Sequence, residues 1–133
     1  MRFGNSGVFV ADVPATVGFY QRAFGQKLRY MHPSKGYAEL ETGATLLSFV
    51  GEAFIDDAKL IGGQAFHANR TNGLPSGAQF AFITEDIERD YRRALDAGAV
   101  AITAPDAKPW GQTMAYVRDN NGFLVELATP PVR

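Results

Sequence analysis

Two segments of the chain repeat one pattern of apolar and polar positions. In each segment a short β-rich run ends at an aspartate, apolar residues then recur every three or four positions, and a glycine follows. The two aspartates are Asp12 and Asp86. Because an aspartate side chain can accept hydrogen bonds from the free N–H groups of a first helical turn, each is expected to cap a helix. The pattern therefore predicts helices over residues 14–24 and 88–97.

Three short strand-like runs follow each predicted helix, separated by turns rich in Gly, Pro, Asn and Asp. They cover residues 27–31, 36–41 and 44–50 in the first half, and residues 99–103, 112–118 and 123–128 in the second. Each half is thus expected to run strand, helix, strand, strand, strand. The predicted fold class is α+β, a duplicated βαβββ unit within one domain. We assign module 1 to residues 1–50, a linker to 51–77 and module 2 to 78–133.

Composition narrows the range of functions. The chain has 133 residues, of which 46% are hydrophobic and 20% charged, as expected for one globular domain. Thirteen Lys and Arg against fourteen Asp and Glu give a net charge of −1, which does not favour nucleic-acid binding. The absence of cysteine excludes disulfides, thiolate nucleophiles and zinc fingers. No apolar run reaches the length of a membrane span, and the first residues do not resemble a signal peptide, so a cytoplasmic location is expected.

The second predicted helix carries a strongly charged face between its apolar positions. This face contains Arg89, Arg92, Arg93 and Asp96. Alternating charges on one helix face are typical of a surface in contact with water. We therefore interpret the arginine cluster as a solvated helix face.

Several short motifs occur in an order that resembles a known superfamily. The first half has Val-Ala-Asp-Val at residues 10–13, and the second has Lys-Pro-Trp-Gly-Gln at 108–112 and Gly-Phe-Leu-Val-Glu-Leu at 122–127. Together with the duplication, these motifs resemble the vicinal oxygen chelate superfamily of glyoxalase I, extradiol dioxygenases and bleomycin-resistance proteins. The resemblance implies paired βαβββ modules whose mixed sheets curl into a cup, commonly in a homodimer. It leaves open whether the cup is completed within one chain or across the dimer.

The resemblance also indicates where a metal ion would bind. Metal-dependent members use four strand positions, which fall here on Asn5, Ser48, Gln79 and Glu126. One carboxylate with two amides and a hydroxyl is a poor ligand set for Fe, Mn, Ni or Zn. We therefore expect no metal cofactor and interpret these four residues as polar ligand contacts. If a divalent metal is present, Gln79 and Glu126 are its expected ligands.

Glu126 is the strongest candidate for chemistry. Period-two alternation puts Leu124 and Glu126 on one face of the last strand, with Val125 and Leu127 on the other. This alternation aims Glu126 into the implied cup, where it would bind an amine or cation, or act as a general acid or base. The alternative is a glutamate on a half-solvated strand face.

Aromatic and sulfur-containing side chains are the expected apolar walls of the site. Trp110 lies between Pro109 and Gly111, which indicates a loop. Its indole would stack on a planar ligand or, alternatively, close the end of the sheet structure. The other expected wall residues are Tyr37, Tyr116, Met114, Phe9 and Phe49.

Two histidines and two arginines have less defined roles. His32 and His67 are interpreted as surface residues, although either would also fit at the edge of a pocket. Arg70 and Arg118 are candidates for holding an acidic group of a ligand. For Arg118 the alternative is an ion pair with Asp119 that stabilises a turn.

Three functions follow as expectations. The first is metal-free sequestration of a small amphipathic or aromatic molecule, of the antibiotic-resistance type, by a homodimer without nucleic-acid or membrane partners. The second is a metal-dependent enzyme of the glyoxalase or dioxygenase type, acting on adjacent substrate oxygens. The third is a metal-free lyase or isomerase that uses Glu126 as its base.

Overall fold

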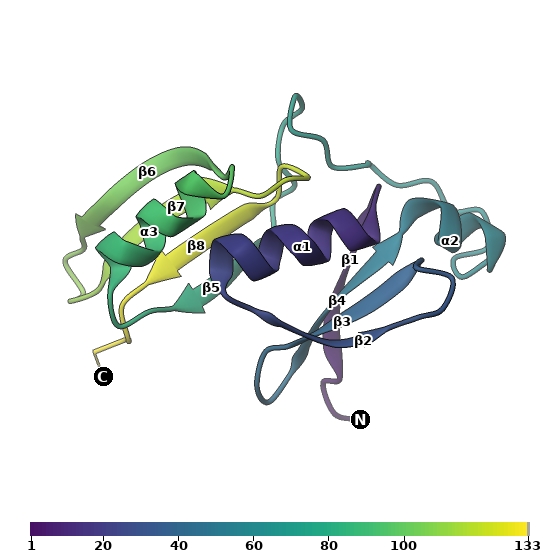
Figure 1. Cartoon of the computed structure of the whole chain (residues 1–133), viewed down its shortest axis with the longest axis horizontal. Helices are drawn as coiled ribbons and strands as arrows, with labels where there is room; N and C mark the ends of the chain where they lie inside the picture. Colours follow the sequence, from purple (N-terminus) through teal and green to yellow (C-terminus); the bar gives the residue numbers. More distant parts are fainter. Residues whose placement is uncertain (133) are drawn as a thin grey trace. The chain divides into compact units, whose positions relative to one another are not determined.

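The computed structural model describes residues 1–132 (Figure 1). The chain divides into two compact units. Unit 1 consists of Met1–Gln21 and Gly25–Ala68, and unit 2 of Arg22–Phe24 and the chain from Asn69 onward. Each unit contains one four-stranded sheet.

Unit 1 contains the first sheet. Its elements are β1 (Asn5–Val10), α1 (Val13–Phe24), β2 (Lys27–Met31), β3 (Tyr37–Glu41), β4 (Leu46–Gly51) and the short helix α2 (Glu52–Asp57). The last three residues of α1 are grouped with unit 2. The strand order is β1-β4-β3-β2, with β1 parallel to β4 and the other pairs antiparallel.

Unit 2 repeats this arrangement. Its elements are β5 (Gln79–Ile83), α3 (Ile87–Asp96), β6 (Val100–Ala107), β7 (Thr113–Arg118) and β8 (Leu124–Ala128). The strand order is β5-β8-β7-β6, again with only the first pair parallel. The two sheets correspond strand for strand, which confirms the predicted α+β fold of two βαβββ modules with mixed sheets.

Both predicted helix caps are present. The Asp12 carboxylate accepts a hydrogen bond from the Ala15 N–H at 2.9 Å, and the Asp86 carboxylate accepts one from the Arg89 N–H at 3.1 Å. These bonds satisfy N–H groups that have no partner within their own helix. At the other end, α1 stops at Gly25, whose φ of 65° is left-handed.

One strand is longer than predicted, and another begins with polar residues. β1 begins at Asn5, and its polar, exposed first residues belong to the strand because they pair with β4. β6 continues through Pro105 to Ala107 instead of ending at Thr103. A proline is tolerated there because β6 is an edge strand with an irregular register, so its missing N–H interrupts no inner ladder.

One face of each sheet packs against a helix. In unit 1 the buried rings of Tyr20 on α1 and Phe49 on β4 meet edge to face with centroids 4.9 Å apart. In unit 2 Ile87 on α3 packs with Ala115 and Leu127 of the sheet. The opposite face of each sheet, called its open face below, carries the other alternate residues of every strand. The fold therefore positions the candidate site on the open faces.

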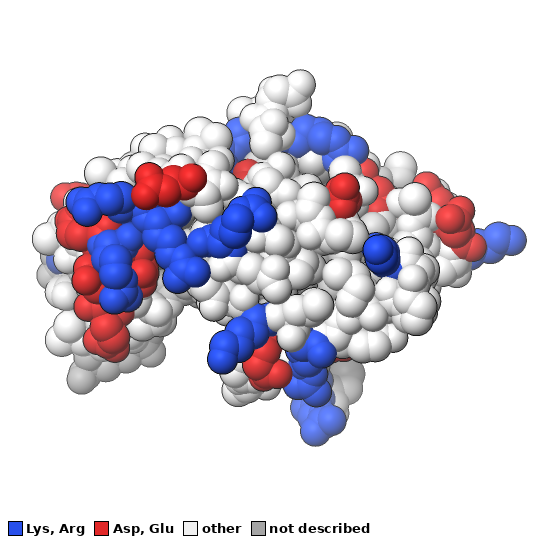
Figure 2. Space-filling view, in the orientation of Figure 1, with Lys and Arg blue, Asp and Glu red and all other residues white. Residues whose placement is uncertain are grey.

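The surface carries no large region of one charge on the face that Figure 2 shows. Basic and acidic side chains are intermixed over α3, and uncharged residues cover much of the remaining surface. Within residues 1–132, no helix has both the length and the apolar character needed to cross a membrane.

Candidate functional site

The open face of the unit 2 sheet centres on Glu126. Val125 and Leu127 are buried on the helix side of β8, which confirms the predicted alternation. In the register of the sheet, Glu126 pairs with Ala81 on β5 and with Tyr116 on β7. Gln79 lies two residues before Ala81 and therefore shares its face. Three strands thus bring Gln79, Tyr116 and Glu126 to one place.

The Glu126 carboxylate has one occupied and one open oxygen. Its Oε2 accepts hydrogen bonds from the Tyr116 hydroxyl and from the Gln79 amide N–H, both at 2.7 Å. Its Oε1 accepts no hydrogen bond from any described residue. This oxygen is not fully buried. Only 7% of Glu126 is exposed. The carboxylate is thus held at one oxygen, while its other oxygen has no hydrogen-bond partner among the described residues.

No cation balances this carboxylate within residues 1–132. Burying a carboxylate without a cationic partner is costly, and two neutral donors offset only part of that cost. The hydrogen bond to Glu126, burial and the nearby negative charge all raise the pKa of the Tyr116 phenol. Tyr116 therefore remains a protonated donor at neutral pH. A carboxylate in this setting is suited to a ligand that brings an N–H, an O–H or a positive charge.

Met114 and Trp110 lie on the same unit as Glu126. Met114 is half-buried on the open face of β7, two residues before Tyr116, and pairs with Ala128 on β8. Trp110 occupies the turn between β6 and β7, as predicted, and is 58% exposed. Its indole N–H donates to Gln112 Oε1 at 3.0 Å, which fixes the ring orientation and leaves ring surface in contact with solvent.

The corresponding positions of unit 1 have a different composition. By register, Ser48 corresponds to Glu126, Asn5 to Gln79 and Glu39 to Tyr116. Ser48 is buried, and its hydroxyl lies 3.5 Å from Asn5 Oδ1 and 3.4 Å from a backbone carbonyl. The structure thus brings Asn5 to Ser48 and Gln79 to Glu126, each pair within its own unit.

Glu39 was not among the predicted site residues, although strand alternation puts it on the same face as Tyr37. Burial raises the pKa of the Tyr37 phenol, and the charge of Glu39 adds to this effect, whereas a hydrogen bond with Ser48 opposes it. The alternation of residues 37–41 is the sequence signal that could have identified Glu39. Only the pairing of β3 with β4 shows that Glu39 lies opposite Ser48, and this pairing cannot be read from the sequence.

Two of the expected wall residues are covered. Phe49 is fully buried against Tyr20 on the helix side of the sheet, so its predicted wall role is wrong. Successive side chains of a strand point to opposite faces of the sheet. Because Ser48 is on the open face, the next residue, Phe49, is on the helix side. Phe9 lies against Phe66 of the connecting segment, with ring centroids 4.9 Å apart.

The residues present do not fit a resident transition-metal ion. Within residues 1–132 no three His, Asp or Glu side chains come together in a way that could hold a metal. Among Gln79, Tyr116 and Glu126, only Glu126 is a carboxylate, and the Gln79 side chain directs its N–H group rather than its oxygen toward that carboxylate. Amide and hydroxyl oxygens alone bind Fe, Ni or Zn weakly.

His32 takes a structural position, whereas His67 lies on the surface. Ser34 donates its backbone N–H to His32 Nδ1 at 3.1 Å, and its hydroxyl lies 2.7 Å from the same nitrogen, so His32 stabilises its own turn. The His32 ring also packs against Phe54. His67 is exposed, as predicted for a surface residue.

Arg118 binds backbone rather than a carboxylate. Its guanidinium donates to the carbonyl oxygens of Gly122 at 2.9 Å, Gly73 at 2.8 Å and Arg70 at 3.2 Å. Asp119, by contrast, accepts the N–H groups of its own turn. Arg118 therefore attaches the segment near residue 70 to the turn before β8, and these contacts do not favour a ligand role.

Gly122 allows this arrangement. Its φ is 87°, and a Cβ atom there would lie 2.5 Å from Arg118 Nη2 and 2.6 Å from the Arg70 carbonyl oxygen. Only glycine accommodates both the left-handed backbone and the close approach of these groups.

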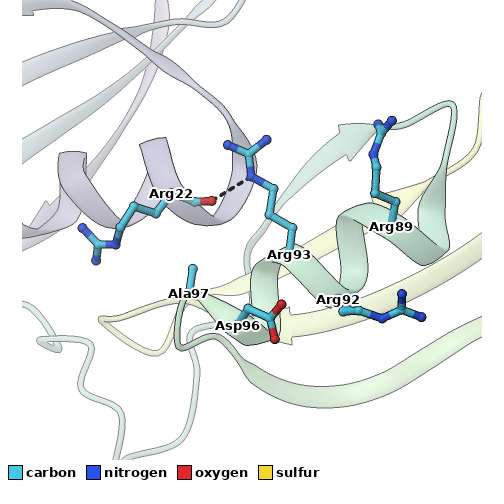
Figure 3. A pocket seen from close by; sticks show the side chains of 6 residues that line it. All are labelled: Arg22, Arg89, Arg92, Arg93, Asp96 and Ala97. Carbon is cyan, nitrogen blue, oxygen red and sulfur yellow. Dashed lines mark hydrogen bonds between the residues drawn. The ribbon is translucent and has the colours of Figure 1, made fainter.

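A hollow lies beside α3, on the helix side of the unit 2 sheet. It measures about 580 Å³ and is open to solvent, and its lining residues are Arg22, Arg89, Arg92, Arg93, Asp96 and Ala97. Figure 3 shows the side chains of Arg22, Arg89 and Arg92 pointing in different directions. Arg93 donates to the Arg22 carbonyl at 2.8 Å. Because these side chains do not converge on one point, the cluster fits the predicted solvated face better than a compact anion site.

Comparison with known proteins agrees with this geometry. The model of the glyoxalase/bleomycin resistance protein/dioxygenase superfamily matches residues 2–127. The fold is similar to that of a glyoxalase-related enzyme from Fulvimarina pelagi, with a TM-score of 0.80 and 20% identity over 99% of this chain and 90% of that chain. It is also similar to a glyoxalase/bleomycin resistance protein/dioxygenase family enzyme from Burkholderia phytofirmans, with a TM-score of 0.74 and 21% identity over 95% and 96% of the two chains.

A sequence relative in Mycobacterium bovis is described as an uncharacterized protein. It is 24% identical over 121 residues, which cover 91% of this chain and 78% of the relative. The solved structures share the fold at low identity, whereas the family match spans the strands of both sheets. The resemblance seen in the order of the motifs is thereby confirmed, and the chain belongs to the glyoxalase/bleomycin resistance protein/dioxygenase superfamily.

Proposed function

We propose that this protein binds a small amphipathic or aromatic molecule without a metal cofactor, in the manner of an antibiotic-sequestering member of its superfamily. The observation that carries the proposal is the Glu126 carboxylate, which is held by Tyr116 and Gln79 at one oxygen and open at the other. A ligand amine or cation would complete the hydrogen bonding of Oε1. Trp110 and Met114 would contact the apolar part of the ligand.

The edge strands of the unit 2 sheet, β5 and β6, also support a homodimer because they carry exposed apolar side chains. Ile83, Val100 and Ile102 are 56%, 52% and 49% exposed. Exposed edge strands offer unpaired backbone groups with which another chain can associate. We therefore include self-association in the proposal, and light scattering on the purified protein tests it. A monomer at all concentrations would contradict this part alone.

Ligand binding is tested by thermal shift and calorimetry with bleomycin and with planar aromatic amines. A bound ligand raises the midpoint of unfolding according to its concentration relative to the dissociation constant. Glu126→Gln should weaken binding of any hit by about tenfold or more, because a hydrogen bond to a charged group is lost. The matched control is Glu88→Gln, which changes an exposed carboxylate on α3 of the same unit. Equal affinity in the wild type and the Glu126 variant would refute the proposed role of Glu126.

Two further measurements separate the remaining parts of the proposal. Trp110→Ala should weaken the same ligands several-fold if the indole stacks on them, and unchanged affinity would remove Trp110 from the site. Elemental analysis of the purified protein should find no stoichiometric divalent metal. One tightly held ion per chain would favour the metal-dependent glyoxalase or dioxygenase function instead.

A metal-free lyase or isomerase is the second candidate function. It is favoured by the same carboxylate, because Oε2 is fixed by two donors while Oε1 remains able to take a proton. In such an enzyme Glu126 would act as the base and the Tyr116 hydroxyl would keep it oriented. Turnover that disappears in Glu126→Gln and decreases in Tyr116→Phe would identify this activity.

A further inference from the structure

We propose a second ligand site, on the open face of the unit 1 sheet, that binds an organic ammonium ion through Glu39, Tyr37 and Tyr30. It uses none of the residues that hold Glu126 and does not depend on the function proposed above. It is built from a carboxylate and two tyrosines on neighbouring strands.

Glu39 supplies the negative charge. It is half-buried on β3, and no described lysine, arginine or histidine forms an ion pair with it. The next residue on the same face, Glu41, is exposed and lies 3.8 Å from the Arg29 guanidinium. The strand thus carries one carboxylate that has a cation and one that has none.

The two tyrosines supply aromatic surface beside this carboxylate. Tyr37 precedes Glu39 by two residues on the same face of β3. The rings of Tyr30 and Tyr37 lie with centroids 6.4 Å apart and planes tilted by 54°. Tilted rings next to a carboxylate form a corner that suits a quaternary or alkylated ammonium group, because the ring faces attract positive charge without needing a hydrogen bond.

A β-bulge brings Tyr30 into this corner. The register of β2 with β3 shifts between Leu28 and Tyr30, so that Leu28 pairs with Leu40 and Tyr30 pairs with Glu39. Without the extra residue, Tyr30 would lie opposite Ala38 and face the buried side of the sheet. Bulges often redirect a side chain near a functional site. Here the bulge places the exposed Tyr30 opposite the unpaired Glu39 in the sheet register.

Choline is a suitable probe because it has a close neutral analogue, 3,3-dimethylbutan-1-ol, of nearly equal shape. In a two-dimensional NMR titration, we expect choline to shift the backbone amides of residues 30 and 37–39 with a dissociation constant of about 10 mM or lower. The neutral alcohol should shift them much less. Equal effects of choline and the alcohol would overturn the proposal, as would no shift at a choline concentration about tenfold above that constant.

Variants assign the site to its residues. Glu39→Gln should weaken choline binding by about threefold or more, and Tyr30→Leu, at an exposed position, should do the same. The matched control is Glu41→Gln, which should leave the affinity unchanged because that carboxylate already has a cation. A loss in Glu41→Gln as large as in Glu39→Gln would show that only the net charge of the strand matters, and would refute the site.

A final variant distinguishes this site from the one in unit 2. In Glu126→Gln the amide shifts at residues 30 and 37–39 should persist with the same affinity. If they disappear while Glu39→Gln has no effect, choline binds at Glu126, which would overturn this inference and leave the proposed function standing. If Glu126 proves to have no ligand role, the choline titration still decides the unit 1 site.

Discussion

The substitution Tyr116→Phe measures how much the hydrogen bond from Tyr116 to Glu126 contributes to the stability of the folded protein. The hydroxyl donates at 2.7 Å to a carboxylate that is 7% exposed. A hydrogen bond to a charged group contributes about 1.5–3 kcal/mol. Because Tyr116 itself is only half-buried, the lower end of that range applies. We expect Tyr116→Phe to lower the free energy of unfolding by about 1.5 kcal/mol.

Glu126→Gln should behave differently. An amide at this position can still accept from Tyr116 and Gln79 through its oxygen, and it avoids the cost of burying an unpaired negative charge. These two effects oppose each other, so the net change should be within about 1 kcal/mol of zero. When Glu126→Gln is already present, the further loss of the Tyr116 hydroxyl should cost only about 0.5–1 kcal/mol, because that hydrogen bond is then neutral.

Urea unfolding followed by circular dichroism and by Trp110 fluorescence measures all four proteins of this double-mutant cycle. For a chain of this size, a loss of about 1.5 kcal/mol corresponds to a decrease of about 5 °C in the midpoint of thermal unfolding. If Glu126→Gln destabilises the protein more than Tyr116→Phe does, the carboxylate is a stabilising part of the fold. That result would refute the reasoning that Glu126 is retained for a ligand.

Three further predictions concern backbone, pH and capping. Gly122→Ala should lower the free energy of unfolding by about 3 kcal/mol or more, because backbone strain and two close contacts add. Gly98→Ala, where φ is also positive but the space is open, should lower it by only about 1 kcal/mol. Urea unfolding measures both variants. Because the pKa of Tyr116 is raised in the folded protein, the stability this phenol contributes is fully present below its unfolded pKa of about 10 and is lost as the pH rises through its folded pKa. Glu126→Gln removes the main cause and should bring the pKa of Tyr116 closer to about 10, which ultraviolet titration of tyrosinate measures against Tyr116→Phe. Asp86→Ala removes a capping bond and should cost about 1 kcal/mol by thermal unfolding, and no loss would show that the cap is dispensable.

Much of the fold could be predicted from local sequence patterns. The helix caps at Asp12 and Asp86 could be predicted because capping joins residues only three positions apart in the sequence. The face of Glu126 followed from alternation within β8 alone. Its neighbour Gln79 followed from the superfamily resemblance together with the duplication, since the same interval separates it from Asp86 as separates Asn5 from Asp12.

The features that were missed depend on register and on distant contacts. Strict alternation would put Tyr30 on the same side as Leu28, and only the bulge in β2 places it opposite Glu39. The contact of Arg118 with the Gly73 carbonyl joins residues 45 positions apart and involves a backbone atom, which leaves no pattern of residue types. Strand pairing and bulges are decided by the packing of the whole sheet, so neither is readable from one segment.

The two units share the same strand pairing but carry their carboxylates on different strands. Corresponding strands occupy corresponding places in the two sheets, yet unit 2 has its buried carboxylate on the fourth strand of the module and unit 1 has its unpaired carboxylate on the third. A carboxylate with one oxygen fixed by a phenol and an amide is expected to favour a ligand that donates a hydrogen bond to its other oxygen. A carboxylate beside two tilted rings selects a diffuse cation, because the rings offer surface and no directed acceptor. The two open faces of this chain are therefore expected to discriminate between ligands by different physical means, although both belong to the same βαβββ arrangement.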